Sequence, residues 1–333
     1  MTTSARITVV GETLVDLVWH TGTGGIAPHP GGSPANVAIG LRRLGHPVAL
    51  ITCWGDDAPG GVVAQYLAGT GLEVVRAPSA SGRTTVALAY VDDTTGSATY
   101  DFLAAWDPRD IPVPDGTVLL HTGSLAAVVA PGADAVVDAC RRLHGRPGTA
   151  VAVDLNVRPA VQPDRDAYRA ALLRLVGAAD IVKASEEDLE WLYPGQDPGR
   201  SARDLLGHGP RLAVLTRGPG GATGFTADAE VSVPAPATAV ADTIGAGDAF
   251  QSALLAAVVE PGAGAGQGVR LPVTPPEVER VLRQAVVAGA IATTRHGAQP
   301  PHLAELRAAL ALDADGPAAE PGEARGPQGV PRA

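Results

Sequence analysis

Two acids and three small residues form the part of the chain whose types and spacing are best suited to chemistry. Asp242 and Asp248 flank a loop that contains Gly245, Ala246 and Gly247, and an apolar run of helical length follows. Such a loop can turn several backbone N–H groups toward one point at the start of a helix, where the helix dipole adds positive potential. The segment therefore predicts an anion hole with a carboxylate beside it.

An anion hole next to a carboxylate is the arrangement that phosphoryl transfer requires. The N–H groups of the glycine-containing loop would hold the charge on the transferred group. Asp248 would accept the proton of an attacking hydroxyl. The alternative explanation of the same residues is a tight turn that only caps a helix.

The elements that must position these residues alternate along the chain. Strand-length apolar runs are expected at residues 7–10, 48–52, 118–121, 151–154, 181–183 and 212–216. Helices are expected at residues 34–44, 60–69, 133–143, 166–176 and 186–192. This alternation predicts an α/β fold with a doubly wound, mostly parallel sheet and helices on both faces. Ligands of such sheets bind at the carboxyl ends of the strands.

Two regions, residues 14–19 and 84–102, interrupt the alternation. In the second region two strand-like runs flank a polar turn at residues 92–97, which indicates a β-hairpin. Because antiparallel ribbons do not fit inside a doubly wound sheet, we expect a small separate sheet built from about residues 12–30 and 84–105. A lid over the active site is the expected use, and a surface hairpin without a catalytic role is the alternative.

The remaining segments predict the domain organisation. Residues 1–312 are expected to form one domain that carries the lid. Residues 313–333 are rich in proline and glycine and lack apolar periodicity, so a disordered tail is expected there. Residues 261–268 are predicted to form a flexible loop between two helices.

Composition favours a small-molecule partner. The 333 residues carry a formal net charge of −10 and no basic run, which disfavours a nucleic-acid backbone or an anionic membrane surface as partner. Cys53 and Cys140 are the only cysteines and lie far apart, so neither a disulfide framework nor a Cys-based zinc site is expected. No secretory signal and no apolar run of membrane-spanning length is present, so a cytoplasmic location is predicted.

Two motifs resemble those of the PfkB-type, ribokinase-like carbohydrate kinases. Residues 242–248 resemble the carboxyl-terminal signature of that family, and Gly-Gly-Ser-Pro-Ala-Asn at residues 31–36 resembles its amino-terminal signature. The resemblance extends over approximately residues 6–310 in the family's order. It implies a ribokinase-like fold and transfer of the γ-phosphate of ATP to a sugar hydroxyl, with Mg²⁺ as cofactor.

The resemblance also implies the sugar-binding residues. In the family, the paired glycines and the asparagine of the amino-terminal signature meet the sugar, which assigns this role to Gly31, Gly32 and Asn36. An aspartate near the end of the first strand binds sugar hydroxyls, and Asp16 matches it. Glycines let the backbone approach a polyol closely, and an amide offers both a donor and an acceptor to vicinal hydroxyls.

The nucleotide side is implied by two further segments. Thr216, Gly218 and Gly221 resemble the loop after a strand where the family's backbone approaches the phosphates of ATP. Lys183 and Ser185 lie in the segment where the family carries an Asn-x-x-Glu motif that organises Mg²⁺ and phosphate through water. Lys183 is also the only lysine of the chain. Chance use of this residue type is the alternative explanation for it.

The same segment departs from the family's usual pattern. Serine occupies the usual asparagine position, and Asp188 occupies the usual glutamate position. Lys-x-Ser followed by acids is frequent in the fructokinase branch. Either Asp188 or Glu187 is therefore expected to organise Mg²⁺ through water.

A monovalent cation site is implied near the carboxyl-terminal end. In ribokinase-like enzymes, backbone carbonyls of a late loop bind such an ion together with groups of the carboxyl-terminal signature. The matching positions here are Asp242, Ile244, Ala292, Arg295 and Gly297. Activation by potassium is the corresponding expectation.

The substrate prediction depends on two segments. Residues 154–159 resemble the Asp-x-Asn-x-Arg segment of fructokinases and 2-keto-3-deoxygluconate kinases, and Arg158 in it would contact a sugar oxygen or a phosphate. The lid strand of sugar-acid kinases usually brings an arginine shortly after a tyrosine, but Tyr100-Asp101-Phe102 has none. D-Fructose is therefore preferred over a sugar acid, with 2-keto-3-deoxygluconate, ribose and nucleosides as alternatives.

Other classes of protein lack their residues. No Gly-x4-Gly-Lys-Ser/Thr and no His-Arg-Asp set occurs, which excludes P-loop and protein-kinase mechanisms. An NAD enzyme would need Gly-x-Gly-x-x-Gly after the first strand, where Gly11-Glu12-Thr13 stands. A sugar-binding regulator without catalysis stays open, although Asp248 argues against it. A homodimer through the lid is a further expectation.

Overall fold

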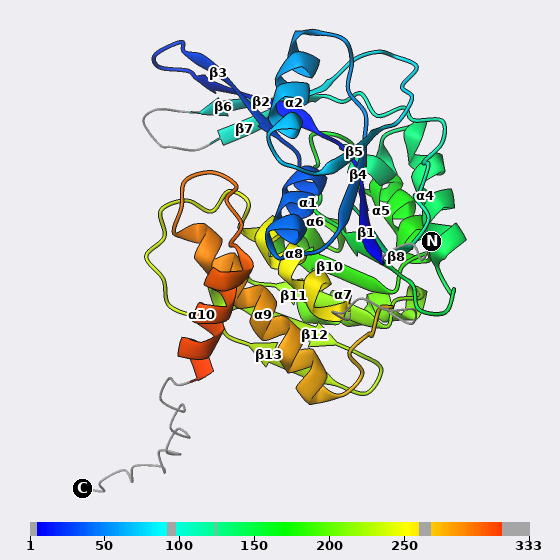
Figure 1. The fold of residues 1–333 in the computed structure, drawn as a ribbon, viewed down its shortest axis with the longest axis vertical. Helices are drawn as coiled ribbons and strands as arrows, with labels where there is room; N and C mark the ends of the chain where they lie inside the picture. The colour runs from blue at the N-terminus through cyan, green and yellow to red at the C-terminus, as the bar shows by residue number, and fades with distance from the viewer. Residues whose placement is uncertain (1–4, 92–97, 124, 260–267, 315–333) are drawn as a thin grey trace, which may run out of the picture.

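The computed structural model describes residues 5–91, 98–123, 125–259 and 268–314. Its main sheet comprises β1 (Arg6–Val10), β4 (Val48–Thr52), β5 (Glu73–Arg76), β8 (Thr117–Gly123), β9 (Ala150–Asp154), β10 (Ile181–Ser185), β11 (Leu212–Thr216), β12 (Ala222–Phe225) and β13 (Glu230–Val233). The strand order is β13-β12-β11-β10-β9-β8-β1-β4-β5 (Figure 1). Strands from β11 to β5 pair in parallel, and β12 and β13 pair antiparallel at one edge. The predicted α/β fold is confirmed.

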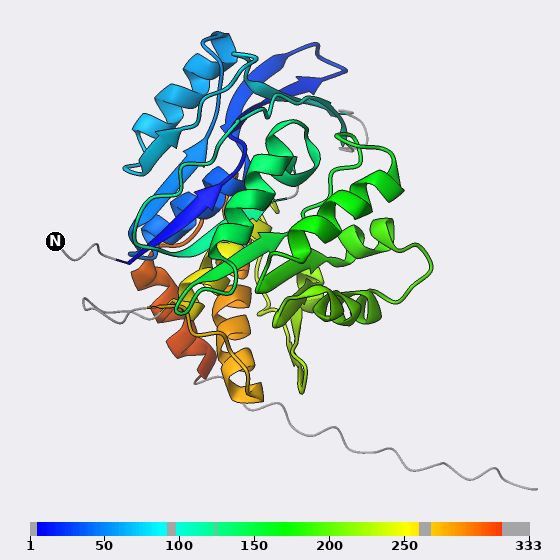
Figure 2. The same ribbon diagram turned by 90° about the vertical axis from the view of Figure 1, so that its right-hand side faces the viewer.

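Helices cover both faces of this sheet (Figure 2). The first face carries α1 (Ser33–Arg43), α2 (Ala58–Ala68), α8 (Ala246–Val258), α9 (Pro275–Thr293) and α10 (Leu303–Ala314). The second face carries α3 (Leu125–Val128), α4 (Gly132–Leu143), α5 (Arg165–Val176), α6 (Glu186–Leu192) and α7 (Pro198–Asp204). Two short 3-10 helices, η1 (Leu205–His208) and η2 (Gly218–Gly220), lie in the connections.

The central strands of the sheet contribute to two hydrophobic cores because successive side chains point to opposite faces. Val9 and Leu50 pack into the core beneath α1 and α8, whereas their chain neighbours Val10 and Ile51 pack beneath α3 and α4. All four side chains are buried. Burial on both faces explains why these strands are almost continuously apolar in sequence.

The small separate sheet expected as a lid is present and has four strands, in the order β3-β2-β6-β7. Its strands are β2 (Leu14–His20), β3 (Ile26–Gly31), β6 (Thr85–Val91) and β7 (Ala98–Leu103). It projects from the main body above the amino-terminal end of α1 (Figure 1). β2 pairs with β6 in parallel, and the outer pairings are antiparallel. The polar turn expected at residues 92–97 lies outside the described residues.

Helix α8 begins earlier than its apolar pattern indicates. The apolar run starts at Ala249, but the helix starts at Ala246, because Gly245 adopts φ 76° and serves as the N-cap. Asp248 therefore stands in the first helical turn. The strands β12 and β13, at one end of the sheet, are not predicted from sequence, since each has only four residues.

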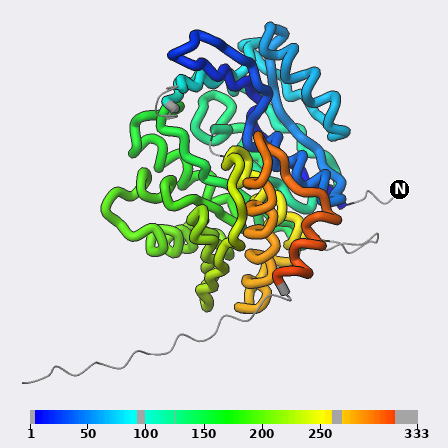
Figure 3. The backbone as a smooth tube through the Cα atoms, turned by 90° about the vertical axis from the view of Figure 1, so that its left-hand side faces the viewer, coloured from blue at the N-terminus to red at the C-terminus, as the bar shows by residue number. Residues whose placement is uncertain are grey.

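The carboxyl-terminal elements pack along one side of the molecule, where α8, α9 and α10 lie side by side (Figure 3). The last described residues, Asp313 and Ala314, end α10, so the predicted tail starts inside a helix and its remainder lies outside the described residues. Most of the loop predicted at residues 261–268 also lies outside them. Within the described ranges, no helix has the length and apolar character needed to cross a membrane.

Candidate active site

The order of strands locates the candidate site. From β1 in the middle of the sheet, the chain first builds β4 and β5 on one side and later β8 to β11 on the other. In doubly wound sheets, ligands bind where the order reverses, outside the carboxyl ends of the strands. Asp154, Ser185 and Thr216 end three of these strands, and Glu12 follows β1 closely.

The predicted anion hole forms the start of α8. A Cβ atom at Gly245 would lie 2.7 Å from Cα of Ala298, so both the positive φ and the close approach require glycine. The N–H group of Ala246 donates to the carbonyl of Thr243 at 3.2 Å. Amides of a first helical turn have no acceptor within the helix, which leaves those of Gly247 and Asp248 to face an anion.

Asp248 is held by two side chains from the start of α1. The hydroxyl of Ser33 donates to Oδ1 at 2.6 Å, and the amide of Asn36 donates to Oδ2 at 2.8 Å. Burial raises the pKa of Asp248, the two hydrogen bonds act against that rise, and Asp154 adds to it. A carboxylate with a raised pKa is a better proton acceptor when a hydroxyl attacks.

The predicted sugar-binding residues lie together beside Asp248. Gly32 has φ 115°, and a Cβ atom there would lie 2.6 Å from the carbonyl oxygen of Glu12. A Cβ atom at Gly31 would lie 2.6 Å from Oδ2 of Asp16, so this carboxylate packs directly on the glycine backbone. Asn36 reaches the same region through its bond to Asp248.

Arg158 interacts electrostatically with the acids on the sugar side of the site. Burial raises the pKa of Asp16, while His29, its neighbour across the strand pair, and Arg158 act to lower it. Arg158 is exposed, and its guanidinium donates to the carbonyl of Val157 at 3.0 Å. The arginine therefore lies close enough to the sugar-side acids to act as their counter-charge.

Glu12 is a second buried acid on this side. Its side chain is 6% exposed, and Oε2 has no hydrogen-bond partner among the described residues. Burial raises the pKa of Glu12 to about 7, Arg158 acts to lower it, and Asp248 acts to raise it.

An ion pair joins the carboxyl end of β9 to the middle of β10. Nζ of Lys183 donates to Oδ2 of Asp154 at 2.8 Å, and both side chains are buried. Burial alone would lower the pKa of Lys183, but the Asp154 carboxylate raises it above its ordinary value. The lysine therefore stays charged.

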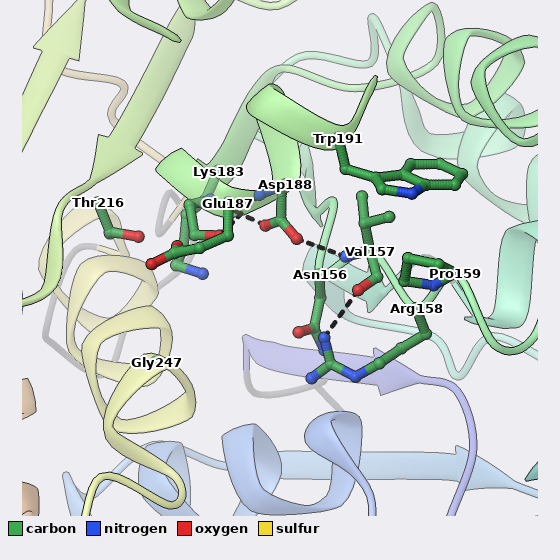
Figure 4. Close-up of a pocket in the computed structure, with 11 residues that line it drawn as sticks. Asn156, Val157, Arg158, Pro159, Lys183, Glu187, Asp188, Trp191, Thr216 and Gly247 are labelled. Atoms are coloured by element: carbon green, nitrogen blue, oxygen red, sulfur yellow. Dashed lines mark hydrogen bonds between the residues drawn. The ribbon is translucent and has the colours of Figure 1, made fainter. Parts of the chain in front are cut away.

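A cavity of about 460 Å³ opens between these strand ends and α8 (Figure 4). It brings together Lys183, Ser185, Thr216 and Gly247 from segments far apart in the sequence, and Arg158 lines its other end. Its other lining residues are Asn156, Val157, Pro159, Glu187, Asp188 and Trp191. The cavity therefore joins the predicted nucleotide residues to the anion hole.

Asp188 has a local structural role. Ser185 is the N-cap of α6 and Asp188 completes a capping box, with Oδ2 accepting the N–H of Ser185 at 2.8 Å. Oδ1 of Asp188 accepts the N–H of Val157 at 2.6 Å. Both oxygens thus have backbone partners, whereas Glu187 is exposed and lines the cavity.

The loop after β11 forms a tight turn. Thr216 ends the strand and lines the cavity, and Gly218 opens η2 with φ 46°. A Cβ atom at Gly221 would lie 2.1 Å from the carbonyl oxygen of Val233, so this glycine is required by packing against β13. Of the three residues predicted in this loop, Thr216 lines the cavity.

The predicted cation residues come from the loop before α8, the end of α9 and the loop after α9, and Asp242 joins the two loops. Its Oδ1 accepts the N–H of Ile244 at 3.0 Å, and its Oδ2 accepts the N–H of Gly297 at 2.8 Å. Partial burial acts to raise the pKa of Asp242, but these N–H donors lower it below its ordinary value. The carbonyl of Ala292 is buried and accepts the N–H of Arg295 at 3.1 Å.

Sequence reasoning missed several contributors to the site. Ser33 belongs to the amino-terminal motif, but nothing in its type indicated a contact with Asp248. Asp154 ends a predicted strand next to the strand of Lys183, and this neighbouring position is the one signal that could have identified the ion pair. Asn156 has φ 33°, a conformation that the sequence did not indicate.

A doubly wound sheet with a carboxylate in the first turn of α8, together with a small second sheet, is typical of the class of ribokinase-fold kinases. The chain belongs to the pfkB family of carbohydrate kinases, whose sequence model matches residues 4–305. It is therefore a phosphotransferase that acts on a carbohydrate.

Relatives and solved structures agree with this family. The chain is 33% identical over 261 residues to a fructokinase of Rhizobium leguminosarum bv. trifolii, covering 74% of this chain and 78% of the relative. It is 31% identical over 318 residues to a fructokinase of Klebsiella pneumoniae, covering 92% and 100%. A fructokinase double mutant from Vibrio cholerae, bound to fructose, ADP and potassium ion, superposes with a TM-score of 0.76 at 27% identity, covering 92% of this chain and 98% of that chain.

Proposed function

We propose that the protein is a fructokinase that transfers the γ-phosphate of ATP to a hydroxyl of D-fructose. The position of Asp248 carries this proposal, because Ser33 and Asn36 hold its carboxylate at the start of α8. The similarity to fructokinases and the absence of an arginine from Tyr100-Asp101-Phe102 support a neutral ketohexose.

In this mechanism the sugar lies between the lid and α1. Asp16 and Asn36 bind its hydroxyl groups, while Gly31 and Gly32 let the backbone approach the ring. Arg158 contacts a sugar oxygen from the opposite side. Closure of the lid excludes water and so limits hydrolysis of ATP.

Asp248 accepts the proton of the attacking hydroxyl. The sugar oxygen then bonds to the γ-phosphorus as the bond to ADP breaks, and the amides at the start of α8 hold the charge on the transferring group. ATP lies along the cavity between Lys183, Ser185 and Thr216, near Gly218 and Gly221. These residues bind and orient the phosphates.

The residues present fit the ions that this chemistry implies. Glu187 would hold Mg²⁺ through water, because its carboxylate is exposed in the cavity while both oxygens of Asp188 have backbone partners. The ion would supply positive charge against the phosphates of ATP. Carbonyls of Ile244, Arg295 and Gly297 fit a potassium ion, since Asp242 holds their two loops together.

The test measures ATP consumption with Mg²⁺ and potassium across fructose, ribose, 2-keto-3-deoxygluconate, adenosine and inosine, with Asp248→Asn alongside. Fructose-dependent turnover that Asp248→Asn abolishes, with sugar affinity nearly intact, is the expected result. Turnover on another acceptor would keep the mechanism and replace the substrate. Sugar binding without turnover on any acceptor would favour a catalytically silent regulator.

The location and assembly of the protein stay predictions. A cytoplasmic location is expected from the sequence. A homodimer through the lid is supported by the exposed apolar side chains of Trp19, Ile26 and Leu103, which the strand register puts on one face of the lid sheet. The molar mass in solution tests the dimer.

A further inference from the structure

The proposed function puts Lys183 on the phosphates of ATP but gives no role to its ion pair with Asp154. Lys183 is the only lysine of the chain, its side chain is 6% exposed, and that of Asp154 is 3% exposed. Register pairing sets Lys183, in the middle of β10, opposite Asp154, the last residue of the adjacent strand β9. A buried pair of charges is costly to form, so it is weak evidence for a role in stability alone.

The ammonium faces the anion hole. A Cβ atom built on Gly247 would lie 3.9 Å from Nζ of Lys183, and both residues line the same cavity. An ammonium has three N–H donors, and the bond to Asp154 uses one of them. The other donors lie where the amides of α8 would hold an anion.

Asp248 is a second carboxylate that interacts electrostatically with the ammonium of Lys183, in addition to Asp154. Lys183 acts to lower the pKa of Asp248, and Asp154 acts to raise it. Asp248 in turn acts to raise the pKa of Glu12, which follows β1, and that of Tyr66 in α2. A direct bond from Lys183 to Asp248 would oppose proton acceptance by the base.

We propose that Lys183 is a further catalytic residue that donates to an oxygen of the transferring phosphoryl group, together with the amides at the start of α8. Asp154 is a positioning residue that holds the ammonium toward the phosphoryl group and away from Asp248. This inference rests on the proposed kinase function. Lys183 transfers no proton, since the hydroxyl proton goes to Asp248 and the broken bond leaves ADP.

Kinetics of Lys183→Met and Lys183→Arg in the full chain give the first test. Loss of a donor to the transferring group lowers turnover by about a hundredfold to a thousandfold in Lys183→Met, with a nearly unchanged KM for the sugar. Lys183→Arg retains the charge and is expected to keep more turnover than Lys183→Met. Turnover of Lys183→Met within about threefold of the unmodified protein would overturn the proposal.

Asp154→Asn tests the positioning role through the pH profile. Removal of the Asp154 charge and release of the Lys183 ammonium both favour the ionised form of Asp248. In Asp154→Asn the acidic limb of the pH profile of kcat/KM therefore moves to lower pH. Turnover falls at the same time. An unchanged acidic limb would assign Asp154 a structural role only. The double variant Asp154→Asn/Lys183→Met removes both buried charges, so neither charge is left unpaired. Its turnover is compared with that of the unmodified protein where a single variant fails to fold.

The single lysine permits a direct measurement on the holoenzyme. Protein labelled with 13Cε-lysine gives one lysine resonance, and its chemical shift is followed with Mg²⁺, fructose and ADP before and after addition of aluminium fluoride. A further shift upon addition of fluoride is expected, because that complex occupies the position of the γ-phosphoryl group. A shift complete with ADP alone would put Lys183 on the nucleotide and overturn the proposal. Absence of turnover in the unmodified protein would reject the kinase function itself.

Discussion

The side-chain amide of Asn36 donates a 2.8 Å hydrogen bond to Oδ2 of Asp248 across 212 residues of chain. This bond joins the start of α1, which carries the proposed sugar loop, to the start of α8, which carries the proposed base. A sugar hydroxyl that reaches Asn36 is thereby brought next to the carboxylate that would accept its proton. The adjacent bond from Ser33 holds the second oxygen of the same carboxylate.

Substitution of Ser33 by alanine is expected to alter the pH dependence of turnover. The hydrogen bond from Ser33 stabilises the ionised form of Asp248. Its removal therefore raises the pKa of Asp248 further and moves the acidic limb of kcat/KM to higher pH. Because a hydrogen bond to a charged group contributes about 1.5 to 3 kcal/mol, kcat/KM should fall about tenfold or more on that limb.

The control for Ser33→Ala is Arg42→Ala on the exposed side of the same helix. Its pH profile should coincide with that of the unmodified protein. An acidic limb that stays in place in Ser33→Ala, despite lower turnover, would contradict the assignment of Asp248 as the base.

Glu12→Gln is expected to remove part of the pH dependence of stability. The unfolded chain releases the Glu12 proton near its ordinary pKa of 4.5, whereas the folded chain holds it until about 7. The folded protein therefore loses stability as pH rises through this window, by on the order of 3 kcal/mol. Urea unfolding at pH 5 and pH 8 measures the effect.

Glutamine cannot ionise, so the free energy of unfolding of Glu12→Gln should rise relative to that of the unmodified protein between pH 5 and pH 8. Parallel pH dependences for the two proteins would show that Glu12 ionises freely in the folded state.

Two adjacent glycines in α2 give a matched test of packing. A Cβ atom at Gly60 would lie 1.9 Å from the carbonyl oxygen of Gly55, whereas one at Gly61 would meet nothing within 4 Å. Gly60→Ala is expected to lower the free energy of unfolding by about 2 kcal/mol or more. Gly61→Ala should raise it by about 0.5 to 1 kcal/mol, because alanine favours the helix.

Denaturant unfolding of both alanine variants provides the measurement. Equal effects of the two substitutions would contradict the close approach of α2 to residues 55 and 84.

Asp242→Ala is expected to abolish activation by potassium. The carboxylate joins the loop of Ile244 to the loop of Gly297, and its removal frees both N–H groups. Turnover should be higher in potassium chloride than in tetramethylammonium chloride for the unmodified protein, and equal in both salts for Asp242→Ala. Equal turnover of the unmodified protein in both salts would reject the cation site.

The helices and strands that surround the site could be predicted from local sequence. The strand at residues 212–216 and the helix at residues 186–192 have the predicted bounds, because apolar periodicity and capping residues act within a few positions. The strands β12 and β13 escaped prediction, since four residues are too few for a periodic signal. The bond from Ser33 to Asp248 also escaped it, because no local pattern encodes a contact across 215 residues.

The sequence by itself determined the α/β alternation, the glycine-containing loop before Asp248 and the family signatures, because each depends on residues close together in the chain. Only the tertiary structure decided which groups are available for chemistry. Asp188 has its oxygens bound by the N–H groups of Ser185 and Val157, whereas Lys183 is turned by Asp154 toward Gly247. The order of strands in the sheet brings these side chains together. Burial and neighbouring charges there shift their pKa values.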